Sequence, residues 1–126
     1  MIREGREMSS VNVVILSGNL VQDPDLRYTP SGTAVATFRL AVNRSYRTKE
    51  GEMKEEVCFV DVVSWGRQAE TCGEYLSKGS PVLVEGRLSF RSWEGEDGQR
   101  RTKYEVVATR VQFLGRPKVD QPLEEV

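Results

Sequence analysis

The chain has 126 residues, of which 38% are hydrophobic and 29% are charged, which is an ordinary composition for a single globular domain. Its formal net charge is −1, so it lacks the overall excess of positive charge that is common in nucleic-acid-binding domains. No apolar run approaches the length of a membrane span and no signal peptide opens the chain, so the sequence predicts a cytoplasmic protein.

Alternating apolar residues separated by turn signals predict strands over most of the chain. Turn residues at 23–25 and 29–32 flank a short extended piece, and a charged loop is expected at 49–56. Two late runs are joined by a hairpin tip at 94–98. The five strands are expected over residues 11–20, 33–46, 57–65, 81–93 and 100–114.

One segment, 66–78, has helical spacing instead. Ala69, Cys72 and Leu76 recur at intervals of three and four residues, and Gly79 is a suitable stop. Five strands with one short helix between the third and fourth predict an all-β OB-fold, a five-stranded Greek-key barrel. A barrel of the same topology without a ligand remains open from pattern alone.

Aromatic residues stand beside arginine at the ends of three predicted strands. The motifs are Arg44-Ser45-Tyr46-Arg47, Trp65-Gly66-Arg67 and Phe90-Arg91-Ser92-Trp93. A single strand of nucleic acid offers unpaired bases, on which rings stack, and phosphates, which meet cations. For any one aromatic residue alone, packing in a core is the better interpretation, but three repeats at strand ends favour binding to a single strand. Because the total charge is near zero, such binding must depend on where the charges lie.

The residues offer little for catalysis or metal binding. The chain has no histidine, no glycine-rich phosphate loop and no serine in a nucleophile elbow, so we expect no enzyme, no cofactor and no metal. Cys58 and Cys72 are interpreted as reduced structural thiols.

Several short motifs carry a resemblance that goes beyond topology. They include Gly18-Asn19-Leu20, Asp23-Pro24, Arg27-Tyr28, Pro30-Ser31-Gly32, Glu74-Tyr75-Leu76 and Val84-Glu85-Gly86-Arg87-Leu88. Each is weak alone, but together they are highly specific. Over residues 11–115 the chain resembles the bacterial single-stranded DNA-binding proteins, the replication SSB family.

The resemblance implies a homotetramer of OB domains in the bacterial cytoplasm, associated with the nucleoid. Such a protein coats single-stranded DNA without sequence preference during replication, recombination and repair. The alternative is an OB-fold replication-restart protein, a scaffold that acts mainly through protein partners. A full set of stacking aromatics favours the first function.

The resemblance also assigns roles to individual positions. The matching base-stacking residues are Tyr46, Phe59, Trp65 and Trp93. The residues expected to contact phosphate are Arg39, Arg44, Arg47, Lys49, Lys54, Arg67, Lys78, Arg87 and Arg91. A weaker group lies across the last hairpin, at Arg100, Arg101 and Lys103. Four other aromatics lie on apolar stripes and are expected in the core: Phe38, Phe90, Tyr104 and Phe113.

Two residues depart from the family pattern inside the expected groove. Val13 stands where the family often has a basic residue, and Asp61 lies between the stacking candidates Phe59 and Trp65. Both remove positive charge, so we expect weaker binding or greater salt sensitivity.

The ends of the chain depart as well. Residues 1–10 are expected to be a flexible arm, 11–116 the DNA-binding domain and 117–126 a short acidic disordered tail. Family members usually end in an acidic tip followed by Pro and Phe, which recruits replication and repair proteins. This chain ends at Leu123-Glu124-Glu125-Val126, which resembles the start of such a tip without its Pro and Phe, so a trimmed or incomplete version of the chain is expected. The first seven residues are either an ordinary arm or a translated ribosome-binding site before a true start at Met8.

Overall fold

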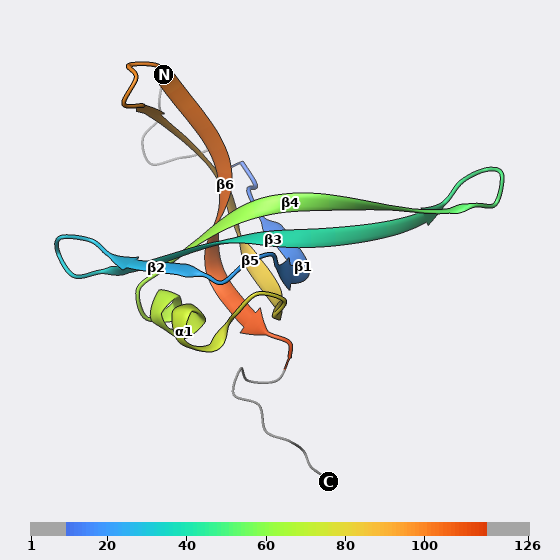
Figure 1. The fold of residues 1–126 in the computed structure, drawn as a ribbon, viewed down its shortest axis with the longest axis horizontal. Coiled ribbons are helices and arrows are strands. Elements are labelled where there is room, and N and C mark those ends of the chain that lie inside the picture. Colours follow the sequence, from blue (N-terminus) through green and yellow to red (C-terminus); the bar gives the residue numbers. More distant parts are fainter. Residues whose placement is uncertain (1–9, 116–126) are drawn as a thin grey trace, which may run out of the picture.

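The structure is a computed structural model that describes residues 10–115. In chain order its elements are β1 (Val14–Leu20), β2 (Asp25–Tyr28), β3 (Ala34–Arg47), β4 (Met53–Trp65), α1 (Arg67–Tyr75), β5 (Pro81–Glu94) and β6 (Arg100–Phe113) (Figure 1). The arm predicted at 1–10, apart from Ser10, and the tail predicted at 117–126 lie outside the described residues, as does the Met8 start.

Five strands close into a barrel in the order β1-β5-β6-β4-β3, and β3 pairs back onto β1 at Asn19↔Ala41 and Leu20↔Leu40. The pairs are antiparallel except for β4–β6, which is parallel and joins Val62 to Val106. Within residues 10–115, the one helix lies between β4 and β5, the third and fourth strands of the barrel in chain order. The predicted OB-fold is therefore confirmed.

Several details of the strands and the helix differ from the prediction. The short extended piece forms a sixth strand, β2, which pairs antiparallel with β3. The loop predicted at 49–56 is shorter, because β4 begins at Met53 and a tight turn at Gly51 (φ 87°) joins it to β3. The helix ends at Tyr75 instead of 78, since Leu76 is already extended (φ −100°, ψ 151°).

The barrel interior is built from alternate residues of the long strands, as their period of two requires. From β3 come Ala36, Phe38 and Leu40, each at most 4% exposed. Valines complete the core: Val62, Val82, Val84 and Val106. The helix α1 lies against β2, β3 and β4 and adds its own buried apolar side chains, Ala69 and Cys72.

Two glycines permit the close contacts that close the barrel. A Cβ on Gly18 would collide with the carbonyl oxygen of Ala41 on β3, and a Cβ on Gly86 would collide with that of Val107 on β6. Gly86 also lies at a break in the β5–β6 register, after Glu85. Such an irregularity bends a strand, which lets β5 pass from the barrel into a hairpin.

Two hairpins extend well beyond the barrel, in different directions (Figure 1). One is the far part of β3–β4, ending in the turn at Gly51, and the other is the far part of β5–β6, ending at Gly98 (φ 81°). Within residues 10–115, no helix has the length and apolar character needed to cross a membrane.

Candidate nucleic-acid interface

The outer face of β4 presents two of the predicted stacking rings. Phe59, Asp61, Val63 and Trp65 alternate on this face, because successive strand residues point to opposite sides. Phe59 is 57% exposed and Trp65 is 50% exposed. A solvent-facing ring of this size has no role in the core of the single chain. The two rings therefore flank Asp61 on an open surface.

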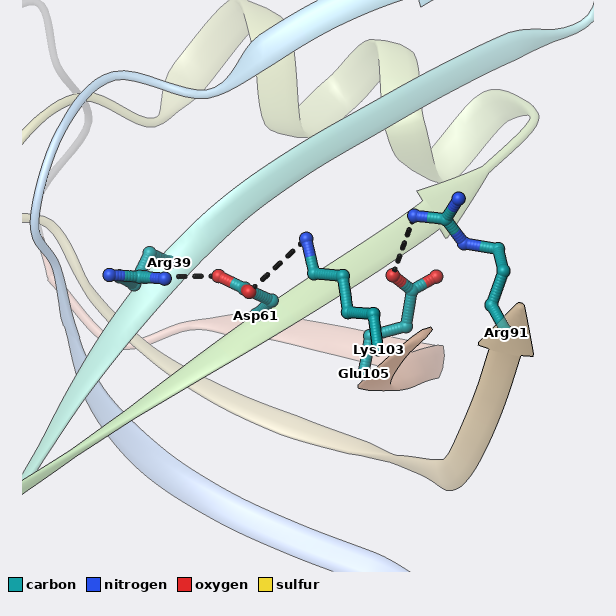
Figure 2. Close-up of polar contacts among 5 residues, drawn as sticks. All are labelled: Arg39, Asp61, Arg91, Lys103 and Glu105. Carbon is teal, nitrogen blue, oxygen red and sulfur yellow. Dashed lines mark hydrogen bonds and ion pairs between the residues drawn. The ribbon is translucent and has the colours of Figure 1, made fainter. Parts of the chain in front are cut away.

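Asp61 is held by cations from two neighbouring strands. Its Oδ1 accepts a hydrogen bond from Arg39 Nε on β3 at 3.0 Å, and its Oδ2 lies 3.2 Å from Lys103 Nζ on β6. Figure 2 shows the carboxylate between the two cations. Partial burial raises the pKa of Asp61, but the hydrogen bonds and charges of Arg39 and Lys103 outweigh it and leave the pKa below its ordinary value.

A second ion pair lies on the β5–β6 hairpin. Arg91 Nη2 is 3.3 Å from Glu105 Oε1, and the Glu105 side chain is only 8% exposed (Figure 2). The same guanidinium lies over the Trp93 ring, 4.5 Å from its centroid. Arg91 therefore joins a buried carboxylate to a stacking candidate.

The two ion pairs line one groove. It has a volume of about 460 Å³, and its lining includes Arg39 and Asp61 from the β3–β4 side and Arg91, Lys103 and Glu105 from the hairpin. Three cations and two of the carboxylates are thus paired inside it, and Asp25 adds a further carboxylate at the wall. The groove is rich in charge but nearly neutral.

Tyr46 lies apart from the other rings. The β3–β4 register pairs Tyr46 with Lys54 without a bulge, so Tyr46 is on the opposite face of the ladder from Phe59. It is 38% exposed, and the guanidinium of Arg44 lies 4.7 Å from its ring centroid. The hairpin therefore presents aromatic and basic groups on both faces.

The predicted phosphate contacts do not all converge on the groove. Arg39 and Arg91 line it, and Arg87 is on the same face of β5 as Arg91. The β3–β4 hairpin carries four others: Arg44, Arg47, Lys49 and Lys54. Two of these are engaged with carboxylates, Arg44 with Glu56 at 3.6 Å and Lys54 with Glu52 at 3.8 Å.

The remaining two cations belong to the helical side of the barrel. Arg67 is the first residue of α1, two positions after Trp65. Lys78 lies in the turn before β5, where its backbone N–H donates to Asp23 Oδ1 at 2.8 Å. Neither residue lines the groove.

The core assignment of four other aromatics is half right. Phe38 is 4% exposed and Phe113 packs against the core. The assignment is wrong for Phe90 and Tyr104, which are 55% and 64% exposed and pack on each other with ring centroids 5.1 Å apart. Their apolar stripe continues past the end of the barrel, where the hairpin has no core to cover it.

Two residues near the groove had a weaker signal or none. Lys103 belonged to the weaker basic group, yet it is a direct partner of Asp61. Arg27 was named only as part of a family motif and was given no role in phosphate contact, but it pairs across β2–β3 with Val35, which pairs with Trp65, so it shares their face. Its position follows from the register between strands, and the alternation of residues within one strand does not reveal that register.

Comparison with known families places the chain. The model of the single-strand binding protein family matches residues 11–114. The chain belongs to this family. Among its curated relatives are a single-stranded DNA-binding protein of Helicobacter hepaticus, 47% identical over 111 residues, and one of Bacillus cereus, 54% identical over 104 residues. The matches cover 87% and 82% of this chain but 65% and 60% of those relatives.

Solved structures of the family agree with the fold. A structure titled as Plasmodium falciparum SSB in complex with ssDNA matches with a TM-score of 0.77 and 28% identity, covering 87% of this chain and all of that one. A deletion mutant of the single-stranded DNA binding protein from Thermus aquaticus matches with a TM-score of 0.74 and 37% identity, covering 83% of this chain and 51% of that one.

Proposed function

We propose that the chain binds single-stranded DNA without sequence preference and protects it during replication, recombination and repair. Membership of the single-strand binding protein family supports this. The observation that carries it most directly is the pair of exposed rings, Phe59 and Trp65, on one face of β4 beside a groove lined with cations. Trp93 extends the same kind of surface onto the hairpin.

The mechanism we propose is passive coating. Bases stack on Phe59, Trp65, Trp93 and Tyr46, which gives affinity without reading sequence, because every base has a flat face. Arginines and lysines around the rings meet phosphates, and this contribution weakens as salt rises. A duplex binds poorly, since its bases are already stacked and its backbone is stiff. No covalent step is involved, so the protein is not an enzyme.

We also propose that the chain assembles with copies of itself as a homotetramer. The structure leaves apolar side chains in contact with solvent in two places, near the start of β1 and on the β5–β6 hairpin. Val13 and Ile15, before and within β1, are 67% and 58% exposed, and Phe90 and Tyr104 form an exposed pair on the hairpin. Exposed apolar patches commonly mark protein interfaces. Phe90 and Tyr104 lie on the opposite face of the hairpin from Arg91 and Trp93, so self-association leaves the DNA face open.

Two further parts of the proposal rest on the family alone. Replication and repair proteins are recruited through the C-terminal tail if the native tail is complete, and the protein works in the bacterial cytoplasm at the nucleoid.

Titration with labelled poly-dT at low salt, followed by fluorescence anisotropy, tests the main proposal. We expect saturable binding, strong quenching of tryptophan fluorescence and weaker binding to duplex DNA. A scaffold that works through protein partners leaves the tryptophan signal nearly unchanged. Light scattering of the free protein measures the number of chains in the assembly.

A further inference from the structure

The groove between the β3–β4 strands and the β5–β6 hairpin contains cations that are already paired with carboxylates. Arg39 and Lys103 reach the two oxygens of one carboxylate, Asp61, at 3.0 and 3.2 Å. They come from β3 and β6, on either side of β4, so this bridge spans three strands (Figure 2). Asp61 is 26% exposed, whereas Arg39 is 53% exposed. The carboxylate is therefore the more sheltered partner and the cations form the rim.

Phosphate competes poorly for cations held in this way. To bind either cation fully, a phosphate must displace a carboxylate or share its cation, and its own charge is repelled by Asp61. The neighbouring pair of Arg91 and Glu105 adds a third cation, which is already neutralised. A third carboxylate at the wall of the groove, Asp25, is also paired, since it lies 3.1 Å from Arg27, so the charges around Asp61 are largely engaged with one another. Little net attraction for a bare polyanion remains there.

The rings beside Asp61 are not affected by this pairing. Phe59 lies two residues before Asp61 and Trp65 four residues after it, on the same face of β4, and both rings are at least half exposed. Stacking needs unpaired bases, which a single strand has and a duplex lacks. A ligand that brings bases to these rings gains affinity that a ligand with phosphates alone does not.

We propose that Asp61 is a specificity-determining residue: by keeping Arg39 and Lys103 in internal ion pairs, it lowers the affinity for duplex DNA and other polyanions more than for single strands. The inference rests on the proposed function. It makes the selectivity of the site depend on stacking at the rings, with the phosphate attraction held down by one carboxylate.

The test is Asp61→Asn, which keeps the size and one oxygen acceptor but removes the charge. Binding of poly-dT and of a duplex of equal length is measured by anisotropy at several salt concentrations. We expect tighter duplex binding, a smaller preference for the single strand and a steeper salt dependence. Asp61 therefore lowers the salt sensitivity of binding, contrary to the expectation from the sequence. Each additional phosphate contact with a duplex adds a further factor of about three to the gain in affinity when salt falls from about 200 to about 50 mM.

The control is Glu74→Gln, which removes one negative charge from an exposed position on α1. If it acts as strongly as Asp61→Asn, the effect is one of total charge and the inference is wrong. Thermal unfolding checks that both variants fold. If Asp61→Asn does not fold, Asp61→Thr repeats the test with a neutral residue that suits a strand.

The outcomes separate this inference from the function on which it rests. If the unchanged protein binds poly-dT but Asp61→Asn has the same affinities and salt dependence, the inference fails and the function stands. Weaker binding of both DNAs by Asp61→Asn also overturns it, since Asp61 then serves to position Arg39 and Lys103 for phosphate. If the unchanged protein fails to bind poly-dT at low salt, the proposed function itself is wrong.

Discussion

The guanidinium of Arg91 covers one face of the Trp93 ring, with its central carbon 4.5 Å from the ring centroid. The same group pairs with Glu105, whose side chain is almost fully buried. A carboxylate fixed between β5 and β6 thereby orients both the cation and the ring it covers. A base that stacks on Trp93 meets a ring with a positive charge already on one side.

Replacing Arg91 tests this arrangement. In Arg91→Ala, Glu105 loses its cation, and an unsatisfied buried charged group costs about 1–3 kcal/mol or more of folding stability. Affinity for poly-dT also falls, because Trp93 loses the cation that covers its ring and is less well oriented. Urea unfolding measures the first effect and anisotropy the second. The double variant Arg91→Met with Glu105→Met recovers stability but not affinity; recovery of both contradicts the assignment.

Removing a stacking ring is the direct test of the site. Trp65→Ala and Trp93→Ala are each expected to lose about 1–3 kcal/mol of binding per affected base contact, the range found for OB-fold proteins that bind single strands. Anisotropy of a labelled strand is the readout, since the variants alter tryptophan fluorescence. Tyr75→Ala is the control, because Tyr75 is an exposed aromatic on α1 that packs near Phe113. Unchanged affinity in both tryptophan variants would show that the rings were wrongly assigned.

The two thiols should differ sharply in reactivity. Cys58 is exposed on β4, whereas Cys72 is on the buried face of α1, and burial raises the pKa of the Cys72 thiol to about 11 despite a hydrogen bond with Ser64. Only a very small fraction of Cys72 is therefore thiolate at pH 8, and thiolate is the reactive form. An aromatic disulfide reagent should modify one thiol per native chain and both in urea. Native Cys58→Ser should not react; rapid labelling of that variant would contradict the burial of Cys72.

Gly86→Ala should destabilise the barrel. The added methyl group collides with the carbonyl of Val107, which belongs to the backbone of β6 and has no rotamer to change. Overpacking of this kind costs about 1–3 kcal/mol, and more where backbone must move. Ser17→Ala, at an exposed position of β1, is the control and should lie within roughly 0.5 kcal/mol of the parent. Equal unfolding midpoints for the two variants would mean that β5 and β6 are further apart here.

Acid should remove the contribution of Asp61 to stability. Its pKa is lowered in the folded chain, so the contribution is present above the ordinary value of 3.8 and is lost as the pH falls through the lower folded value. Asp61→Asn is expected to be less stable than the parent at pH 7, by no more than about 1 kcal/mol because the pairs are partly exposed. Below the folded pKa the two proteins should converge. If the two proteins still differ in stability by the same amount at low pH, the ionised Asp61 carboxylate is not the source of the difference.

The sequence predicted the barrel well because its signals are local. Each long strand carries its own alternation, and glycine marks the turn at Gly51 and the turn before β5 at Gly79. The common face of Phe59, Asp61 and Trp65 also follows from their even spacing within one strand. These features depend on neighbours in the chain.

The prediction failed where the answer depended on other strands. Phe90 and Tyr104 have the alternation of core residues, but nothing in one strand shows where it leaves the barrel. The partners of Asp61 were not visible either, because Arg39 meets it through the β3–β4 register and Lys103 through the short parallel pairing of β4 with β6. Whether a cation is available to a ligand depends on such contacts.

The two projecting hairpins have a consequence for how such a chain can vary. Each is held outside the barrel by its own ladder, and each reverses at a glycine remote from the buried valines. Lengthening or shortening a hairpin at its tip therefore changes the span of the molecule without disturbing the interior. The area of ligand that the domain covers can therefore change with hairpin length while the stability of the barrel stays the same.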